Sequence, residues 1–545
     1  MEKTWLKHYP EGVPAEIDAD AYPSILSIFQ RSVAQFAARP AFSNKDTTLT
    51  FADIDRLSRN FAAFLQQSKS IGKGSCVAIM MPNLLQYPVA LFGIIRTGAK
   101  IVNINPLYTQ RELEHQLVDS GADAIVIFSE AVPVLTALID GTEVETVVVT
   151  GVNDLASDEG GMGGMNPYLI AFNSALAEGQ ELELDTIEIA SNDVAFLQYT
   201  GGTTGPAKGA ILTHRNIVAN LMQFSAVVAP ELEFAEETIV TALPLYHIFG
   251  LTVNCLGFVY LGGHNVLITN PRDLRGFVEE VAKHRVSVWN GVNTLFNSLL
   301  NTDGFTTLDF SALKLCVGGG AAVQSSVAEK WAKVTGCPIL EGYGLSETSP
   351  LLTFNPVDAK QFSGSIGIPV PSTDISLRDD QGVEVPEGEV GELCTLGPQV
   401  MKGYWQCDEA TQEVMTEDGY FKTGDIARVD ENGFFYIVDR KKDMVLVSGF
   451  NVFPNEVEAV VAECDGVLEC ACVGVKDAKS GEAVKLFVVA KPGADLSVED
   501  IRAHCKNHLT SYKQPKYVEF MEALPKSNVG KILRRELREI GYEKD

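Results

Sequence analysis

The residues with the clearest chemical potential form a glycine- and threonine-rich stretch at 199–209, near the middle of the chain. Its backbone N–H groups and hydroxyls could converge on phosphate oxygens, and Lys208 adds a cation at its far end. A Walker A loop requires Gly before the Lys and Ser or Thr after it, whereas this chain has Ala207 and Gly209. The segments on both sides have the composition of strands. The alternative interpretation is a glycine-rich hairpin turn without a ligand.

The composition limits the classes of protein to which the chain can belong. With 545 residues, 46% of them hydrophobic, it can bury a large core and should form more than one domain. A net charge of −28 argues against nucleic acid as a partner. The ten cysteines have no metal-ligand spacing, and the first residues lack the apolar run of a signal peptide. Residues 239–263 are uncharged but interrupted by Pro, His, Asn and Gly, so we expect buried core beside a pocket and no transmembrane helix.

Between about residues 75 and 345, short β-rich runs alternate with helical patterns, including a predicted helix over 106–120. This alternation predicts parallel sheets with helices on both faces. Ligands bind such sheets at the carboxyl ends of the strands, where Gly318, Gly319 and Gly320 are expected. Shorter strands and turns after residue 365 indicate a β-rich subdomain. The predicted fold class is α/β, with a large N-terminal domain of parallel α/β sheets and this subdomain.

The last hundred or so residues are long enough for a small α+β domain. They follow a charged stretch at 439–443. We predict an N-terminal domain over 1–439, a hinge at 440–442 and a C-terminal domain over 443–545. Residues 502–535 contain eight Lys or Arg against two Asp or Glu, which suggests either a polyanionic ligand or a solvated basic face.

Six further motifs follow the glycine-rich stretch in a fixed order, and together the seven resemble the AMP-forming acyl-CoA synthetases of the adenylate-forming superfamily. Each is weak alone, whereas all seven in order are specific. Further stretches look like the bacterial long-chain fatty-acid–CoA ligases, so the resemblance covers nearly the whole chain except about 151–185. The six motifs are at 243–250, 318–320, 341–348, 391–393 with 403–405, 420–425 and 524–531, and the further stretches are 81–90, 105–109 and 439–454.

The resemblance implies ATP, CoA and a fatty acid as substrates and Mg²⁺ as a cofactor. Thr200 and Glu347 would coordinate Mg²⁺, a hard cation that prefers oxygen ligands. Ser346, at a position where most relatives have Thr, would donate to the α-phosphate, and Asp425 and Arg440 would bind the ribose. The implied ATP site consists of Tyr199, Thr200, Gly201, Gly202, Thr203, Thr204, Gly205, Lys208, Gly342, Tyr343, Ser346, Asp425 and Arg440.

The candidate catalytic residues are Lys531, Glu347 and His247. Joining a carboxylate to ATP brings two anions together, so the site must supply positive charge. Lys531, which follows Gly530, could neutralise that charge as it develops. The resemblance makes His247 a gate of the acyl pocket, while a packed core histidine is the alternative. The expected lining of the acyl pocket is Phe249, Gly318, Gly319 and Gly320.

The resemblance further implies that the C-terminal domain is mobile. Lys531 must occupy the site during adenylation and leave it before the CoA thiolate attacks. Lys442 matches the hinge position of the family, and the loop that would line the path of CoA consists of Ser448, Gly449 and Phe450. Many relatives carry a Lys where this chain has Leu446, so the contact of that Lys cannot be transferred.

Several alternatives to a fatty-acid ligase stay open. An amino-acid adenylation domain should place an acidic group near 243–250, yet 239–263 contains no Asp or Glu. An aryl-acid or short- to medium-chain ligase has the same motifs, because composition does not reveal pocket length. Luciferase-type enzymes, which oxygenate their adenylate, also share these motifs. A non-catalytic acyl- or nucleotide-binding protein would not need Glu347, Asp425 and Lys531 together. The resemblance implies a cytoplasmic enzyme, and a substrate supplied from the inner face of a membrane would suit peripheral association.

Overall fold

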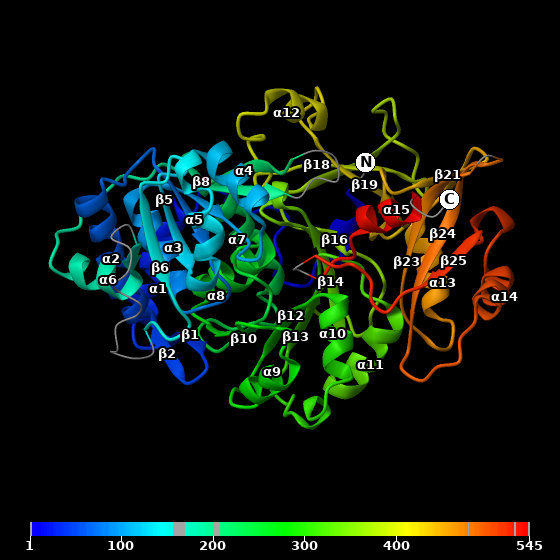
Figure 1. Cartoon of the computed structure of the whole chain (residues 1–545), viewed down its shortest axis with the longest axis horizontal. Coiled ribbons are helices and arrows are strands. Elements are labelled where there is room, and N and C mark those ends of the chain that lie inside the picture. The colour runs from blue at the N-terminus through cyan, green and yellow to red at the C-terminus, as the bar shows by residue number, and fades with distance from the viewer. Residues whose placement is uncertain (1–2, 156–168, 201–205, 478, 528–529, 543–545) are drawn as a thin grey trace.

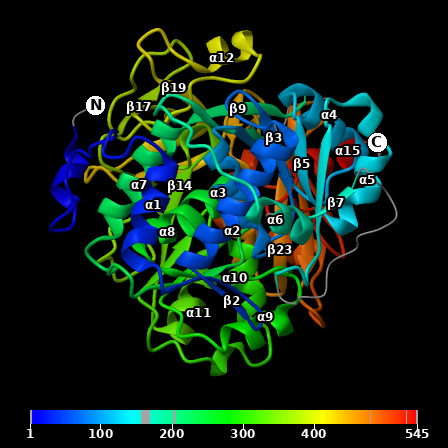
Figure 2. The ribbon, with the colours of Figure 1, turned by 90° about the vertical axis from the view of Figure 1, so that its left-hand side faces the viewer.

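The computed structural model describes residues 3–155, 169–200, 206–477, 479–527 and 530–542, and the strands of this part form four sheets. Two large, mostly parallel sheets belong to the N-terminal part of the chain. A small antiparallel sheet follows, and the last sheet contains only C-terminal strands. Figures 1 and 2 place the C-terminal strands at the opposite end of the long axis from helices α2 (Phe51–Ala63) and α6 (Phe172–Gln180). The predicted fold class is confirmed.

A seven-stranded sheet has the order β7-β6-β5-β3-β4-β8-β9. All its neighbours pair in parallel except β8 and β9, which form an antiparallel hairpin. Every residue of β3 and β5 is buried, as expected of parallel strands covered on both faces. Its strands are β3 (Cys76–Met80), β4 (Lys100–Asn103), β5 (Ala124–Phe128), β6 (Thr146–Thr150), β7 (Leu169–Ala171), β8 (Val194–Thr200) and β9 (Lys208–Thr213).

A nine-stranded sheet has the order β16-β15-β14-β13-β12-β10-β11-β1-β2, with antiparallel strands only towards its two edges. The predicted position of the three glycines is confirmed, because β13 ends at Gly318. Its strands are β1 (Pro40–Asn44), β2 (Thr47–Thr50), β10 (Thr238–Thr241), β11 (His264–Leu267), β12 (Val288–Gly291), β13 (Leu315–Gly318), β14 (Ile339–Gly344), β15 (Leu351–Phe354) and β16 (Ile368–Pro369).

Helices fill the space between these two sheets and cover their outer faces. All residues of α3 are buried, and a Cβ added at Gly93 would lie 2.7 Å from Cδ1 of Phe61 in α2. One core cluster combines residues of both sheets with residues of α1, α2, α3 and α7. Besides α2 and α6, the helices that lie between the two sheets or on their outer faces are α1 (Ile25–Phe36), α3 (Gln86–Thr97), α4 (Gln110–Ser120), α5 (Val132–Thr136), α7 (His214–Val228), α8 (Gly257–Leu261), α9 (Leu274–Val281), α10 (Asn293–Leu300) and α11 (Ser325–Thr335).

Two segments differ in detail from the sequence-based expectation. The helix predicted from 106 begins only at Gln110, because Thr109 and Glu112 form a capping box that fixes its start. The uncharged segment 239–263 is buried core, as predicted, and part of it is a π-helix over Phe249–Leu256. Among the described helices, none has the length and apolar character needed to cross a bilayer.

The β-rich subdomain predicted after residue 365 is confirmed as an antiparallel sheet, β17-β18-β19-β20. Its core also buries Trp5 from the N-terminal 3₁₀ helix Thr4–His8, with the Trp5 and Phe435 rings 6.2 Å apart. The strands are β17 (Asp374–Arg378), β18 (Gly391–Leu396), β19 (Phe421–Val429) and β20 (Phe435–Arg440), and α12 (Asp408–Val414) lies between β18 and β19 in the chain.

The C-terminal residues form a separate sheet with the order β22-β21-β24-β23 and β25 beside β24. This sheet has its own apolar clusters, one of which contains Val457, Leu486 and Ile501. The elements are β21 (Val445–Val447), β22 (Phe450–Val452), α13 (Pro454–Ala462), β23 (Val467–Asp477), β24 (Gly481–Ala490), α14 (Val498–His508), β25 (Tyr517–Phe520) and α15 (Arg534–Tyr542).

Candidate active site

The glycine-rich stretch joins the two strands of the β8–β9 hairpin, as predicted. Thr200 and Lys208 are partners in this hairpin, whereas the predicted residues Gly201, Gly202, Thr203, Thr204 and Gly205 lie outside the described residues. The Lys208 Nζ atom lies 5.5 Å from the centre of the Tyr404 ring. The Tyr199 hydroxyl donates to Oδ2 of Asp119. The hydroxyl of Tyr199, a predicted residue of the ATP site, is therefore occupied by a partner within the protein.

Glu347 follows β14 in a short 3₁₀ turn and is buried, with 8% of its surface exposed. Its Oε1 atom accepts a hydrogen bond of 2.8 Å from the Tyr404 hydroxyl. Tyr404 belongs to the motif at 403–405, although its residue type and position in the sequence indicate no role. Because Tyr404 contacts both Lys208 and Glu347, it connects the phosphate hairpin with the predicted metal ligand.

Asp425 and Arg440 are direct partners in the β19–β20 ladder. Arg440 Nε lies 3.1 Å from Oδ1 of Asp425, and the Tyr343 hydroxyl donates to Oδ2 at 2.6 Å. The attraction of Asp425 raises the pKa of Arg440, so the guanidinium is charged at any physiological pH. Each carboxylate oxygen retains a further lone pair for a ligand hydroxyl. The structure therefore brings Tyr343, Asp425 and Arg440 together, as predicted.

Lys531 reaches this cluster from the C-terminal part of the chain. Its side chain lies beside Gly320, where an added Cβ would be 3.4 Å from Lys531 Cε. Burial, with a smaller contribution from the charge of Arg440, lowers the pKa of Lys531 to about 8, while Asp425 and Glu347 oppose the shift. All four charged groups thus interact at one place. Gly530 adopts a φ of +80°, which favours glycine, and an added Cβ there would lie 2.6 Å from Thr294 Oγ1.

The predicted acyl-pocket residues also lie together. A Cβ at Gly319 would come within 2.8 Å of the Phe249 ring, so the glycine is needed for this close approach. Burial lowers the pKa of His247 to about 3, with a smaller contribution from Lys531. His247 is therefore neutral at pH 7, and its Nδ1 accepts from the Phe249 backbone N–H at 3.3 Å. Glu341, which begins the motif at 341–348 but had no role predicted from the sequence, is a buried carboxyl beside Gly318 whose pKa burial raises to about 7.

The predicted hinge residue Lys442 lies next to this cluster, two positions after Arg440, whereas the predicted CoA residues lie on a separate hairpin. Lys442 is exposed in the turn that follows β20. Ser448 and Gly449 form the tight turn between β21 and β22, both with positive φ. Phe450 is 56% exposed and stacks on Tyr512 with ring centres 4.8 Å apart. No contact found within the described residues links this hairpin to Lys531.

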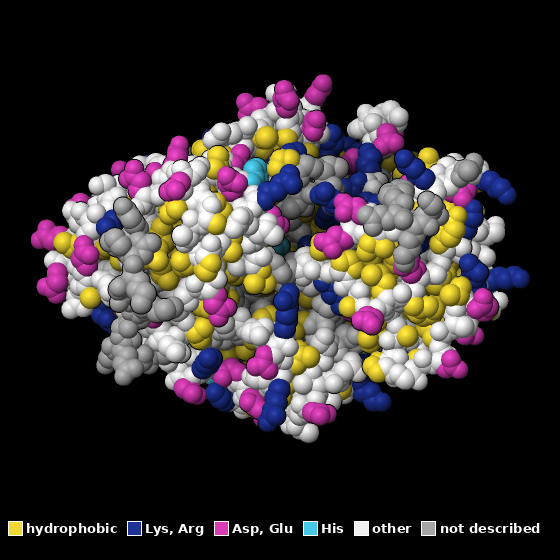
Figure 3. All heavy atoms as spheres, viewed as in Figure 1, with side chains coloured by type: hydrophobic (Ala, Val, Ile, Leu, Met, Phe, Trp, Pro, Cys, Tyr) yellow, Lys and Arg dark blue, Asp and Glu magenta, His cyan; other side chains and the backbone are white. Residues whose placement is uncertain are grey.

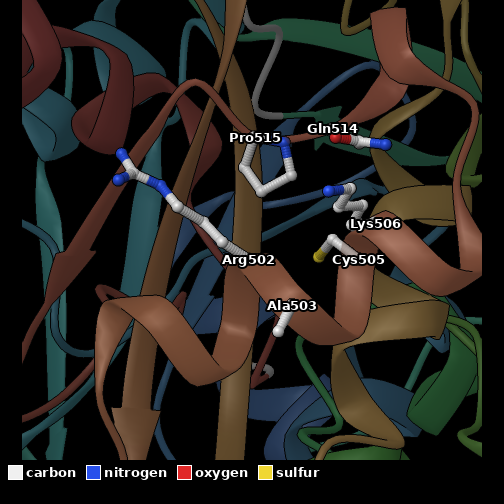
Figure 4. Close-up of a pocket in the computed structure, with 6 residues that line it drawn as sticks. All are labelled: Arg502, Ala503, Cys505, Lys506, Gln514 and Pro515. Atoms are coloured by element: carbon white, nitrogen blue, oxygen red, sulfur yellow. The ribbon is translucent and has the colours of Figure 1, made fainter.

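Five of the eight cations in 502–535 form ion pairs with acidic side chains. Of the others, Lys531 is in the cluster described above, and Arg502 and Lys506 line a hollow of about 220 Å³ with Cys505, Gln514 and Pro515. Figure 4 shows Lys506, Gln514 and Pro515 grouped on one side of it, with Arg502 extending away. The predicted polyanionic ligand of this region stays a prediction. Figure 3 shows another depression, near the middle of the molecule, with Lys and Arg side chains around its upper rim.

The adenylate-forming enzymes have this architecture: two large α/β sheets and a small C-terminal domain whose lysine enters the active site. The model of the AMP-binding enzyme family matches residues 29–405, and that of the AMP-binding enzyme C-terminal domain matches residues 456–531. The chain therefore belongs to the AMP-binding enzyme family, and the resemblance found in the sequence is confirmed.

Individual proteins agree with this assignment. The chain is 55% identical over 553 residues to the long-chain-fatty-acid–CoA ligase of Yersinia pestis, covering 99% of this chain and 98% of the relative. An anthranilate CoA ligase in complex with anthranoyl-AMP superposes with a TM-score of 0.86 at 26% identity, over 96% of this chain and 99% of that one. ATP-bound MatB from Rhodopseudomonas palustris has a TM-score of 0.84 at 27% identity, over 95% of this chain and 99% of that one.

Proposed function

We propose that the protein activates a long-chain fatty acid in two steps. The acid first attacks the α-phosphate of ATP to give acyl-AMP and pyrophosphate, and CoA then displaces AMP to give acyl-CoA. The observation that carries this proposal is the convergence of Lys531 with Glu347, Asp425 and Arg440, residues from three different sheets or the loops beside them. The high identity to a long-chain ligase over the whole chain supports the choice of acid.

In the first step the chain must hold two anions close together. With a pKa of about 8, Lys531 is mostly protonated at pH 7, and its burial strengthens its attraction for the carboxylate and the α-phosphate. The nucleotide ribose would donate to Asp425, which Tyr343 and Arg440 hold in place. Ser346 would donate to the α-phosphate, and Lys208 would contact the outer phosphates.

Mg²⁺ would be held by Glu347 and Thr200 together with the phosphates of ATP. The fit is favourable because Tyr404 engages one Glu347 oxygen and leaves the other without a partner in the described residues. No cluster of three or more His, Cys, Asp or Glu suited to a metal occurs in the described part, so ATP itself would supply much of the coordination. The bound ion would neutralise phosphate charge and orient the pyrophosphate leaving group.

The second step requires a different arrangement of the same parts. Lys531 occupies the cluster, while Ser448, Gly449 and Phe450 lie on an exposed hairpin away from it. We therefore propose that residues 443–545 rotate about a hinge at 440–442, centred on Lys442, relative to residues 1–439. Rotation would withdraw Lys531 and bring the hairpin to the path of the CoA thiol. Peripheral membrane association stays a prediction that cosedimentation with lipid vesicles would test.

The decisive experiment measures pyrophosphate release and AMP formation with saturated fatty acids of increasing chain length, with benzoate and amino acids as controls. We expect release to increase with chain length and to be negligible with both controls. Faster turnover of benzoate than of any fatty acid would favour the aryl-acid ligase instead. Absence of AMP with every acid would refute the proposed function.

A further inference from the structure

A buried carboxylate bridges the two sides of the proposed hinge. Asp439 immediately precedes the turn at 440–442, and its side chain is fully buried. Its Oδ2 atom accepts a hydrogen bond of 2.8 Å from the backbone N–H of Asn455, in the first turn of α13. The residue at the N-cap position of α13, Phe453, has no side chain that can cap the helix. A side chain on the N-terminal side of the hinge therefore caps a helix on its C-terminal side.

A second set of contacts connects this cap to the catalytic lysine. Arg534 begins α15, only three residues after Lys531. It donates to Oδ1 of Asn455 at 2.6 Å and to Oε2 of Glu458 at 2.8 Å, and its Nη1 lies 3.9 Å from Oδ1 of Asp439. The loop that carries Lys531 is thus anchored to the same end of α13 that Asp439 caps.

The surroundings of Asp439 in this pose destabilise its ionised form. Burial raises the pKa of Asp439 to about 6, and the charge of Glu458 adds to this effect. Arg534 and the backbone N–H groups of Arg440 and Asn455 oppose it without cancelling it. Rotation would return the carboxylate to water, where its pKa is about 4. Ionisation therefore favours the rotated pose, so at pH 7 the charge of Asp439 weakens the pose that its hydrogen bond stabilises.

We propose that Asp439 is a positioning residue that holds Lys531 in the adenylation pose by capping α13 across the hinge, and that this cap must break before thioester formation. The inference rests on the proposed two-step function. The hydrogen bond to Asn455 stabilises the adenylation pose. The buried charge of Asp439 destabilises the same pose, which allows the C-terminal part to leave it. Removal of the acceptor and removal of the charge alone should therefore have opposite consequences.

Two variants separate these contributions. Asp439→Ala removes the acceptor, so adenylation should fall roughly tenfold while thioester formation from supplied acyl-adenylate continues. Asp439→Asn removes the charge but can keep its one acceptor oxygen towards the Asn455 N–H, losing only the local bond from the Arg440 N–H, so adenylation should be largely spared and the thioester step slowed about tenfold. The two half-reactions are measured separately, as pyrophosphate release and as thioester formation from acyl-adenylate and CoA.

Asp500→Asn is the matched control, because Asp500 accepts from the backbone N–H of Ser497 at the start of α14 and both residues lie on the C-terminal side of the hinge. This variant should leave the ratio of the two half-reactions unchanged. Equal losses in both half-reactions for either Asp439 variant would overturn the inference. So would a change in the ratio of the two half-reactions that has the same direction in Asp439→Ala and Asp439→Asn. Failure of the wild-type protein to form AMP would instead refute the proposed function, so the two failures are distinguishable.

Discussion

The replacement of Lys531 by Met tests the central element of the proposed chemistry. Methionine retains most of the apolar stem beside Gly320 but has no charge. Loss of one preorganised charge in a water-poor site slows the step it serves by about 100- to 1,000-fold, or roughly 3–4 kcal/mol in activation free energy. Adenylation should fall by that amount, whereas thioester formation from supplied acyl-adenylate should survive because Lys531 is withdrawn during that step.

The pH dependence gives an independent check on this prediction. The pKa of Lys531 is lowered to about 8, so the active cation is present below pH 8 and is lost as the pH rises through that value. The kcat/KM of wild-type adenylation should fall above about pH 8, since kcat/KM reports the free enzyme. In Lys531→Met this decline should disappear from the residual activity.

Lys526→Met provides the matched control, because Lys526 lies in the same loop but pairs with Glu469. It changes the net charge equally and should leave adenylation within about twofold, as expected of a half-buried ion pair near the surface that lies away from the reacting groups. The assay is pyrophosphate release over a range of pH, with both variants checked for thermal unfolding. Adenylation that is unchanged in Lys531→Met, or a decline above pH 8 that persists in it, would refute the assigned role.

Three further outcomes are expected. Asp425→Asn should raise the KM for ATP roughly tenfold or more, because the ribose and Arg440 both lose a charged acceptor; an unchanged KM for ATP in a steady-state assay would contradict this. Gly319→Ala places a methyl group 2.8 Å from the Phe249 ring, so kcat/KM should fall more for long-chain than for short-chain acids, and a uniform fall across chain lengths would argue against a pocket at this position. Lys442→Pro should spare pyrophosphate release and slow thioester formation by restricting the turn after β20, whereas equal loss of both half-reactions would count against the hinge.

The arrangement of sheets and the identity of most site residues could be predicted because local patterns determine them. Alternating strands and helices indicated the parallel sheets, and the end of β13 at Gly318 followed from that pattern. The helix expected from 106 was placed too early, because the capping box at Thr109 competes with the helical pattern before it. The π-helix over Phe249–Leu256 depends on packing between the sheets and has no simple sequence signal.

The contacts that sequence reasoning missed join residues far apart in the chain. Tyr404 reaches Glu347 from 57 residues away, and Asp439 caps a helix whose own N-cap residue is a phenylalanine. The missing cap at Phe453 is visible in the sequence, but nothing there shows which carboxylate replaces it. Tertiary packing supplies such partners, so the spacing of residues along the chain cannot reveal them.

The pairing of Asp425 with Arg440 has a consequence for the order in which products leave. Arg440 both contacts the carboxylate assigned to the ribose and is the first residue of the proposed hinge. A nucleotide held by Asp425 therefore restrains the first residue of the hinge about which the C-terminal part turns. We expect AMP to remain bound through the turn and to depart after the thioester, so that an abandoned acyl-adenylate seldom escapes into solution.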